Sequence, residues 1–130
     1  MNSDQTNARL EGTKLANFAP VPSVTELQIN DTIEGTGDTV QPGATITAHY
    51  TGALATDGTI FQSSLDMGRP ITFGLNQVIA GWQKGVPGMK IGGTRRLTIP
   101  AAEAYGANSP APNIPANSDL VFDIELVAIS

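Results

Sequence analysis

The chain has 130 residues with a formal net charge of −5 at pH 7, and 40% of its residues are apolar while 15% are charged. This length suits one domain with a modest core, and the 14 glycines and 9 prolines predict a turn-rich β fold with short strands. Because nucleic acids and anionic membranes bind basic surfaces, the acidic balance argues against both as partners. The sequence has no cysteine and one histidine, His49, which excludes disulfides, thiolate chemistry and a zinc site built from such ligands.

The first 22 residues, MNSDQTNARLEGTKLANFAPVP, lack regular apolar periodicity and end in two nearby prolines. We predict that residues 1–22 are an extension or tether, ordered only where Leu15 or Phe18 finds a groove, and that the folded domain spans residues 23–130. With no run of 18 apolar residues and no basic stretch before an apolar core, we expect neither a membrane span nor a signal peptide. The compartment stays open between the cytoplasm and an extracytoplasmic location after loss of an N-terminal anchor.

Alternating apolar and polar residues predict most of the domain to be β-strand. In ATITAHYTGAL, residues 44–54, Ile46, Ala48 and Tyr50 share one face, which is typical of a half-buried strand. The C-terminal stretch 119–130 alternates over its whole length, and RRLTIP at 95–100 is its expected antiparallel partner. Further strands are predicted at 60–64 and 71–75, and two more with a loop before residue 44.

One segment, residues 77–86, has a helical pattern. Asn76 is a suitable N-cap, Val78 and Trp82 lie four residues apart on one face, and glycine and proline at 85 and 87 end the pattern. Residues 101–118 contain three prolines and are expected to form a long exposed loop. These elements predict an α+β fold in which a five- to six-stranded antiparallel sheet curves around one short helix.

Seven motifs, in order, resemble the FKBP-type peptidyl-prolyl cis-trans isomerases over roughly residues 27–130. They are AHYTG at 48–52, DG with IFQSS at 57–64, QVIAGW at 77–82, GMKIGGTRRLTIP at 88–100, AYGA at 104–107, IP at 114–115 and LVFDIEL at 120–126. The loop before VIAGW is similar in length to that of the bacterial macrophage-infectivity-potentiator-type members. The resemblance implies the same fold and a ligand pocket between helix and sheet.

The resemblance also implies which side chains form that pocket. Trp82 corresponds to the floor on which a prolyl ring lies, Ile79 to a backbone N–H donor for a ligand carbonyl, and Tyr105 to a hydroxyl donor. The catalytic set carried over is Tyr50, Phe61, Trp82, Tyr105 and Phe122, and the substrate-binding set is Gln62, Ile71, Val78, Ile79 and Ile114.

The chemistry needs no cofactor and no metal. Rotation about a peptide bond is opposed by about 18–20 kcal/mol because resonance is lost. The twisted amide has less charge separation than the planar amide, so a dry pocket that removes water from the carbonyl favours the twisted form, and a few donors can hold the substrate in that geometry. We therefore expect proline-containing peptides or proteins as partners, macrolides such as tacrolimus or rapamycin as ligands, and a monomer.

The sequence departs from the family pattern at three pocket positions. Gln62 stands where the family has an aspartate, Met67 where it has an arginine, and Ile71 where it has a phenylalanine. The aspartate positions pocket groups through hydrogen bonds, so its replacement predicts reduced activity. The alternative hypothesis is a chaperone or binding module that holds proline-containing segments with weak or no turnover.

Overall fold

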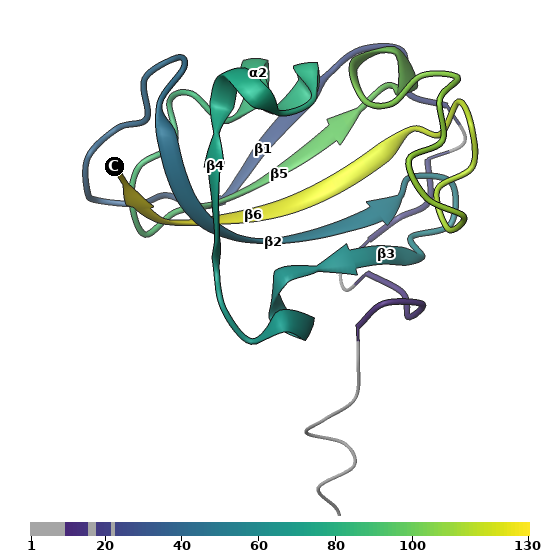
Figure 1. The fold of residues 1–130 in the computed structure, drawn as a ribbon, viewed down its shortest axis with the longest axis horizontal. Coiled ribbons are helices and arrows are strands. Elements are labelled where there is room, and N and C mark those ends of the chain that lie inside the picture. The colour runs from purple at the N-terminus through teal and green to yellow at the C-terminus, as the bar shows by residue number, and fades with distance from the viewer. Residues whose placement is uncertain (1–9, 16–17, 22) are drawn as a thin grey trace, which may run out of the picture.

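The computed structural model describes residues 10–15, 18–21 and 23–130. An antiparallel sheet with the strand order β1-β5-β6-β2-β3 forms the frame, and β4 pairs with the first half of β2. Figure 1 shows the sheet curving around α2, with β4 crossing in front of the sheet. The strands are β1 (Gln28–Ile33), β2 (Thr45–Leu54), β3 (Ile60–Ser63), β4 (Ile71–Gly74), β5 (Thr94–Ile99) and β6 (Leu120–Ile129).

Strands β2 and β6 form the centre of the sheet and pair along their whole length. The side chains of Ile46, Ala48 and Ile124 point to one side, as the alternation predicts, and are fully buried there. β5 pairs with β6 in antiparallel register, and Arg96 lies opposite Asp123. The predicted pairing of 95–100 with the C-terminal strand is therefore confirmed, and the concave face of the sheet holds the core.

The helical segment differs from the prediction. A 3-10 turn covers Leu75–Gln77, Val78 is extended, and α2 covers only Ala80–Gly85. Its N-cap is Ile79, which makes no side-chain capping bond, so the prediction of Asn76 as the cap is wrong. The extended backbone at Val78 interrupts the helical hydrogen bonds, and Val78 and Trp82 do not share one helix face.

Close packing against β5 explains why so short a helix contains glycines. A Cβ carbon on Gly85 would lie 2.7 Å from Leu97, so only glycine permits this approach. The buried Arg95 holds the end of the helix, because its guanidinium donates to the carbonyl of Gly85 over 2.8 Å and pairs with Asp31 on β1. Tertiary contacts, and not helix propensity, thus stabilise α2.

Two loop predictions also need correction. The stretch before residue 44 forms only one strand in the described chain, β1, and Thr39 adds an isolated bridge to Lys90. The loop 101–118 begins with a 3-10 turn at Ala101–Glu103 and is not exposed throughout, because Ile114 is buried in the main core. An apolar side chain amid prolines can anchor a loop even though the prolines prevent it from joining the sheet.

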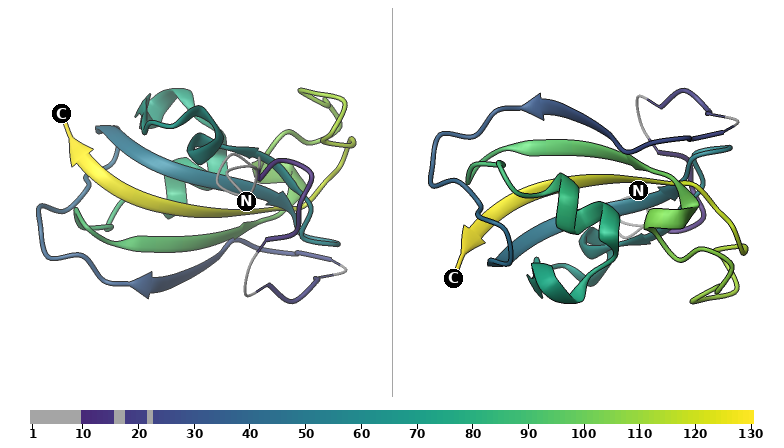
Figure 2. Two further views of the ribbon diagram at one scale, coloured as in Figure 1. Left: turned by 90° about the horizontal axis from the view of Figure 1, so that it is seen from below. Right: turned by 90° about the horizontal axis from the view of Figure 1, so that it is seen from above.

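The N-terminal residues contribute a second, smaller apolar cluster on the other side of the sheet. Leu15 and Val24 are buried there against Ala53, Ile60 and Val121. Phe18 packs against it, and Figure 2 shows the N-terminal segment alongside the turn that joins β2 to β3.

Candidate active site

Trp82 lies among aromatic rings that come from three strands. Its ring meets Phe122 edge-on, with centroids 5.4 Å apart and planes at 87°, and it meets Tyr50 at 5.7 Å and 79°. Phe73 completes the contact from β4 at 5.0 Å. Edge-to-face pairs of this kind are favourable beyond their buried area, and they fix the orientation of the indole ring.

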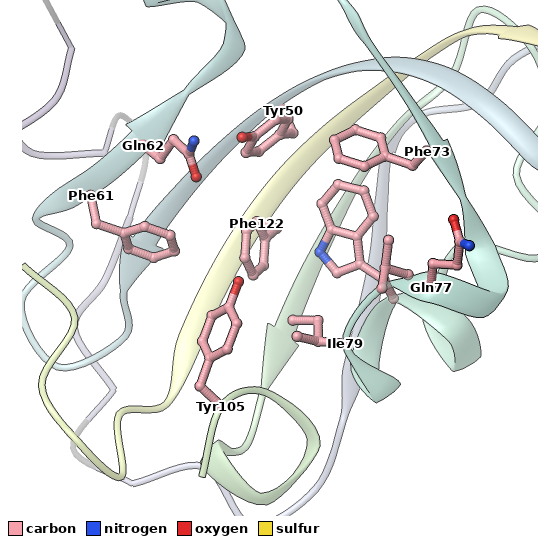
Figure 3. A pocket seen from close by; sticks show the side chains of 10 residues that line it. Tyr50, Phe61, Gln62, Phe73, Gln77, Ile79, Tyr105 and Phe122 are labelled. Atoms are coloured by element: carbon pink, nitrogen blue, oxygen red, sulfur yellow. The ribbon is translucent and has the colours of Figure 1, made fainter. Parts of the chain in front are cut away.

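Beside the indole lies a cavity of about 320 Å³ between α2, the sheet and the loop after β5. Figure 3 shows the hydroxyl of Tyr105 directed into it and Gln62 at the side where the hydroxyl of Tyr50 lies. The lining residues are Tyr50, Phe61, Gln62, Phe73, Gln77, Val78, Ile79, Trp82, Tyr105 and Phe122.

The structure brings together most of the predicted site residues. All five predicted catalytic residues line the cavity, as do Gln62, Val78 and Ile79. Ile71 and Ile114 are not among the lining residues: Ile71 is half-buried against the core, and Ile114 is buried within it.

Sequence reasoning missed two lining residues, Phe73 and Gln77. Phe73 has the same strand parity as Ile71, so the alternation in ITFGL placed it on the correct face. The position along the strand could not be deduced from that parity, because β4 crosses the sheet and only its second half approaches Trp82. Gln77 gave no signal, since its placement depends on the break between the 3-10 turn and α2.

A glycine in β2 lets two of the aromatic walls meet. A Cβ carbon on Gly52 would lie 2.6 Å from the ring of Phe61 and 2.7 Å from that of Phe122. The bare backbone therefore accommodates the edge-to-face contact of these rings, whose centroids are 5.7 Å apart. The glycine of the AHYTG motif thus shapes one end of the cavity.

All the described residues that line the cavity are uncharged, and several hydrogen-bond donors in it lack a protein acceptor. The indole Nε1 of Trp82 is buried without a partner, and no described residue accepts a hydrogen bond from the backbone N–H of Ile79. Backbone donors are normally paired, so the unpaired N–H of Ile79 suits a ligand that brings an acceptor.

Burial affects the two tyrosines of the cavity in the same direction. Desolvation raises the pKa of the Tyr50 hydroxyl above its ordinary value, and the neighbouring Tyr105 raises it further. Desolvation also raises the pKa of Tyr105. Both hydroxyls therefore remain protonated at neutral pH and are able to donate hydrogen bonds.

Residues 37–127 match the family described as FKBP-type peptidyl-prolyl cis-trans isomerase. An FK506-binding protein of Neisseria meningitidis serogroup B is 48% identical over 105 residues, which are 79% of this chain and 95% of that protein. The isomerase FkpA of Aeromonas hydrophila is 46% identical over 125 residues, 95% of this chain but only 42% of FkpA.

Solved structures give the same relationship. FkpA from Escherichia coli is similar with a TM-score of 0.73 and 38% identity, covering 80% of this chain and 48% of that one. A peptidyl-prolyl cis-trans isomerase from Pseudomonas syringae pv. tomato has a TM-score of 0.73 and 35% identity, covering 85% and 83% of the two chains.

The chain therefore belongs to the FKBP-type peptidyl-prolyl cis-trans isomerases, and its sheet curved around a short helix is the fold of that enzyme family. It spans less than half of the FkpA proteins that it matches. Within the described residues, no helix has both the length and the apolar character needed to cross a membrane.

Proposed function

We propose that this domain accelerates cis-trans isomerisation of X-Pro bonds by binding the proline on Trp82 and holding the preceding amide in a twisted geometry. The observation that carries the proposal is the uncharged aromatic cavity, lined by Ile79 and Tyr105, whose backbone N–H and hydroxyl have no acceptor among the described residues. A prolyl ring is apolar, and its nitrogen has no N–H. The carbonyls of the proline and of the preceding residue lie on either side of this nitrogen and can accept hydrogen bonds. A prolyl segment therefore matches a site of rings and donors.

Three groups carry the proposed chemistry. The face of Trp82 supports the prolyl ring, while the N–H of Ile79 and the hydroxyl of Tyr105 donate to substrate carbonyls. Rings from Tyr50, Phe61 and Phe122 exclude water from the amide. Loss of hydration disfavours the planar, more polar amide relative to the twisted one, and this difference lowers the rotational barrier.

Gln62 bears on how efficient this reaction is. Gln62 lies on β3 and lines the cavity, and its side chain forms no hydrogen bond with a described residue. A carboxylate at this place would accept hydrogen bonds and attract positive charge, whereas an amide is neutral and weaker as an acceptor. We infer that turnover is reduced compared with an aspartate-containing site. The second candidate function, a module that binds proline-containing segments with little turnover, rests on the same residue.

A protease-free isomerisation assay on a short X-Pro peptide tests both candidates. We expect the wild type to exceed the uncatalysed rate, and Gln62→Asp to raise kcat/KM further by about tenfold, the equivalent of one charge-assisted hydrogen bond. Gln77→Glu, at the other lining glutamine, is the matched control for adding a negative charge without restoring that geometry. No rate above background, together with peptide binding, would favour the binding module.

Macrolide binding is proposed on the same cavity. Relatives that are 48% identical carry the name FK506-binding protein, and a macrolide that mimics a prolyl peptide would need the same floor and donors. The chain has one tryptophan, so the emission of Trp82 reports occupation of the cavity directly. Titration with rapamycin is expected to change this emission with one ligand per chain.

A further inference from the structure

A short N-terminal segment, residues 10–15, lies along the outer edge of β3 and is called the arm below. The N–H of Gly12 donates to the carbonyl of Ile60 over 2.7 Å, and Ile60 donates back to Thr13 over 2.8 Å. The Asp66 carboxylate accepts the backbone N–H groups of Leu10 and Glu11 over 2.8 and 3.0 Å. The arm therefore extends the sheet beyond β3, the strand that carries Phe61 and Gln62 into the cavity.

Asn113, in the loop 101–118, joins three segments through one side-chain amide. Its Nδ2 donates to the carbonyl of Phe61 on β3 over 2.9 Å and to the Glu11 carboxylate of the arm over 3.3 Å. Figure 1 shows the purple arm and the yellow-green loop on opposite sides of the start of β3, where this link forms.

A hollow of about 260 Å³ lies beside this link, and it is lined by Glu11, Gly12, Thr59, Ile60 and Asn113. The amide of Asn113 spans from the loop to both other segments across the edge of this hollow.

The loop can transmit this restraint to Tyr105. The Ser109 hydroxyl lies 2.7 Å from the carbonyl oxygen of Ala111 and 2.6 Å from that of Ile114, and its single proton, donated to either or shared by both, closes the tip of the loop on itself. Asn117 donates to the carbonyl of Gly106 over 2.7 Å and closes its base, next to Tyr105. These bonds join the segment that carries Asn113 to the segment that carries Tyr105.

We propose that Asn113 is a positioning residue, which fixes the separation of Phe61 and Tyr105 across the prolyl cavity by tying the loop to β3 and to Glu11 of the arm. The inference rests on the proposed isomerase function, because Phe61 and Tyr105 are two of its cavity walls. The arm is then a part of the isomerase site, although none of its residues lines the cavity.

The test compares Asn113→Asp and Asn113→Ala with Asn108→Ala, an exposed asparagine of the same loop. Asn113→Asp keeps the volume but replaces the donor with an oxygen that repels both acceptors. We expect both Asn113 variants to lower kcat/KM and to weaken rapamycin binding by about fivefold, the equivalent of one hydrogen bond, at a temperature where all variants are folded. Asn108→Ala should match the wild type.

A double-mutant cycle with Glu11→Ala separates positioning from general destabilisation. Glu11→Ala should lower kcat/KM in the wild type, because it removes an acceptor, but raise it in Asn113→Asp, because it removes a repelling carboxylate. Equal effects in both backgrounds, or kcat/KM of both Asn113 variants within about twofold of wild type, would overturn the proposal.

NMR decides the inference even where the isomerase proposal fails. A wild type without activity would defeat the isomerase proposal alone. The amide signals of Phe61 and Tyr105 should still shift in Asn113→Asp and stay unchanged in Asn108→Ala. Unshifted signals in Asn113→Asp would show that the loop and β3 are not coupled through this residue.

Discussion

The backbone of Gly81 in α2 lies directly against the side chain of Ile99 in β5. A Cβ carbon at position 81 would come within 2.6 Å of Cγ2 of Ile99, and Trp82, the next residue, lines the cavity. Because residue 81 has no methyl group, α2 can approach β5 closely. This approach sets the distance of the Trp82 indole from the sheet.

Gly81→Ala is therefore expected to destabilise the domain, although alanine is the better helix former. Overpacking of a dry interface costs about 1–3 kcal/mol, which exceeds the gain of up to about 1 kcal/mol in helix propensity. Urea unfolding measures the difference. Lys84→Ala, on the exposed side of α2, is the control and should change the free energy of unfolding by less than about 0.5 kcal/mol. A stabilised Gly81→Ala would contradict the close packing.

Tyr105→Phe should weaken ligand binding while leaving the fold intact. The hydroxyl makes no hydrogen bond to a described residue, so its removal leaves no protein group unpaired. We expect the free energy of unfolding to change by less than about 0.5 kcal/mol, and rapamycin affinity and kcat/KM to fall by roughly three- to tenfold. Fluorescence titration and the peptide assay measure both, and an unchanged affinity would remove Tyr105 from the donor set.

Phe73 should matter more for binding than Ile71, although the family resemblance pointed to position 71. Phe73→Leu removes the ring that contacts Trp82 and Tyr50, whereas Ile71→Val shortens a side chain that does not line the cavity. We expect Phe73→Leu to raise the Kd for rapamycin by about fivefold, the equivalent of one aromatic contact, and Ile71→Val to leave it within about twofold. A larger rise in Kd for Ile71→Val than for Phe73→Leu would show that Phe73 is not the aromatic wall of the binding site.

The reaction should show little pH dependence in the neutral range. Burial raises the pKa of Tyr50 and Tyr105, so both hydroxyls stay protonated and kcat/KM should be flat between about pH 6 and 9. A bell-shaped profile in this range would indicate a titrating acid or base instead.

The stability of the fold at alkaline pH depends on the same two hydroxyls, those of Tyr50 and Tyr105. Because their folded-state pKa lies above the unfolded value of about 10, their contribution is fully present below pH 10 and is lost as the pH rises through the folded pKa. The Tm should fall more steeply there in the wild type than in a Tyr50→Phe, Tyr105→Phe double variant.

Local patterns predicted the parts of the fold that local physics governs. Side chains alternate across a strand with a period of two, so the inward face of β2, with Ile46, Ala48 and Tyr50, was readable from residues 44–54 alone. The same holds for β6 and its antiparallel partner β5. Motif order then indicated the family, and the structure brought all five predicted catalytic residues to one cavity.

The sequence by itself determined the central strands β2, β5 and β6, the family, and five of the six aromatic residues of the site, because periodicity and motif spacing are properties of the chain. Only the tertiary structure decided the start of α2 after Val78, the place of Phe73 beside Trp82, and the link of Asn113 to the arm. These features depend on contacts between residues far apart in the chain. Gly81 fits against Ile99 and Asn113 reaches Glu11 only once the sheet has brought them together.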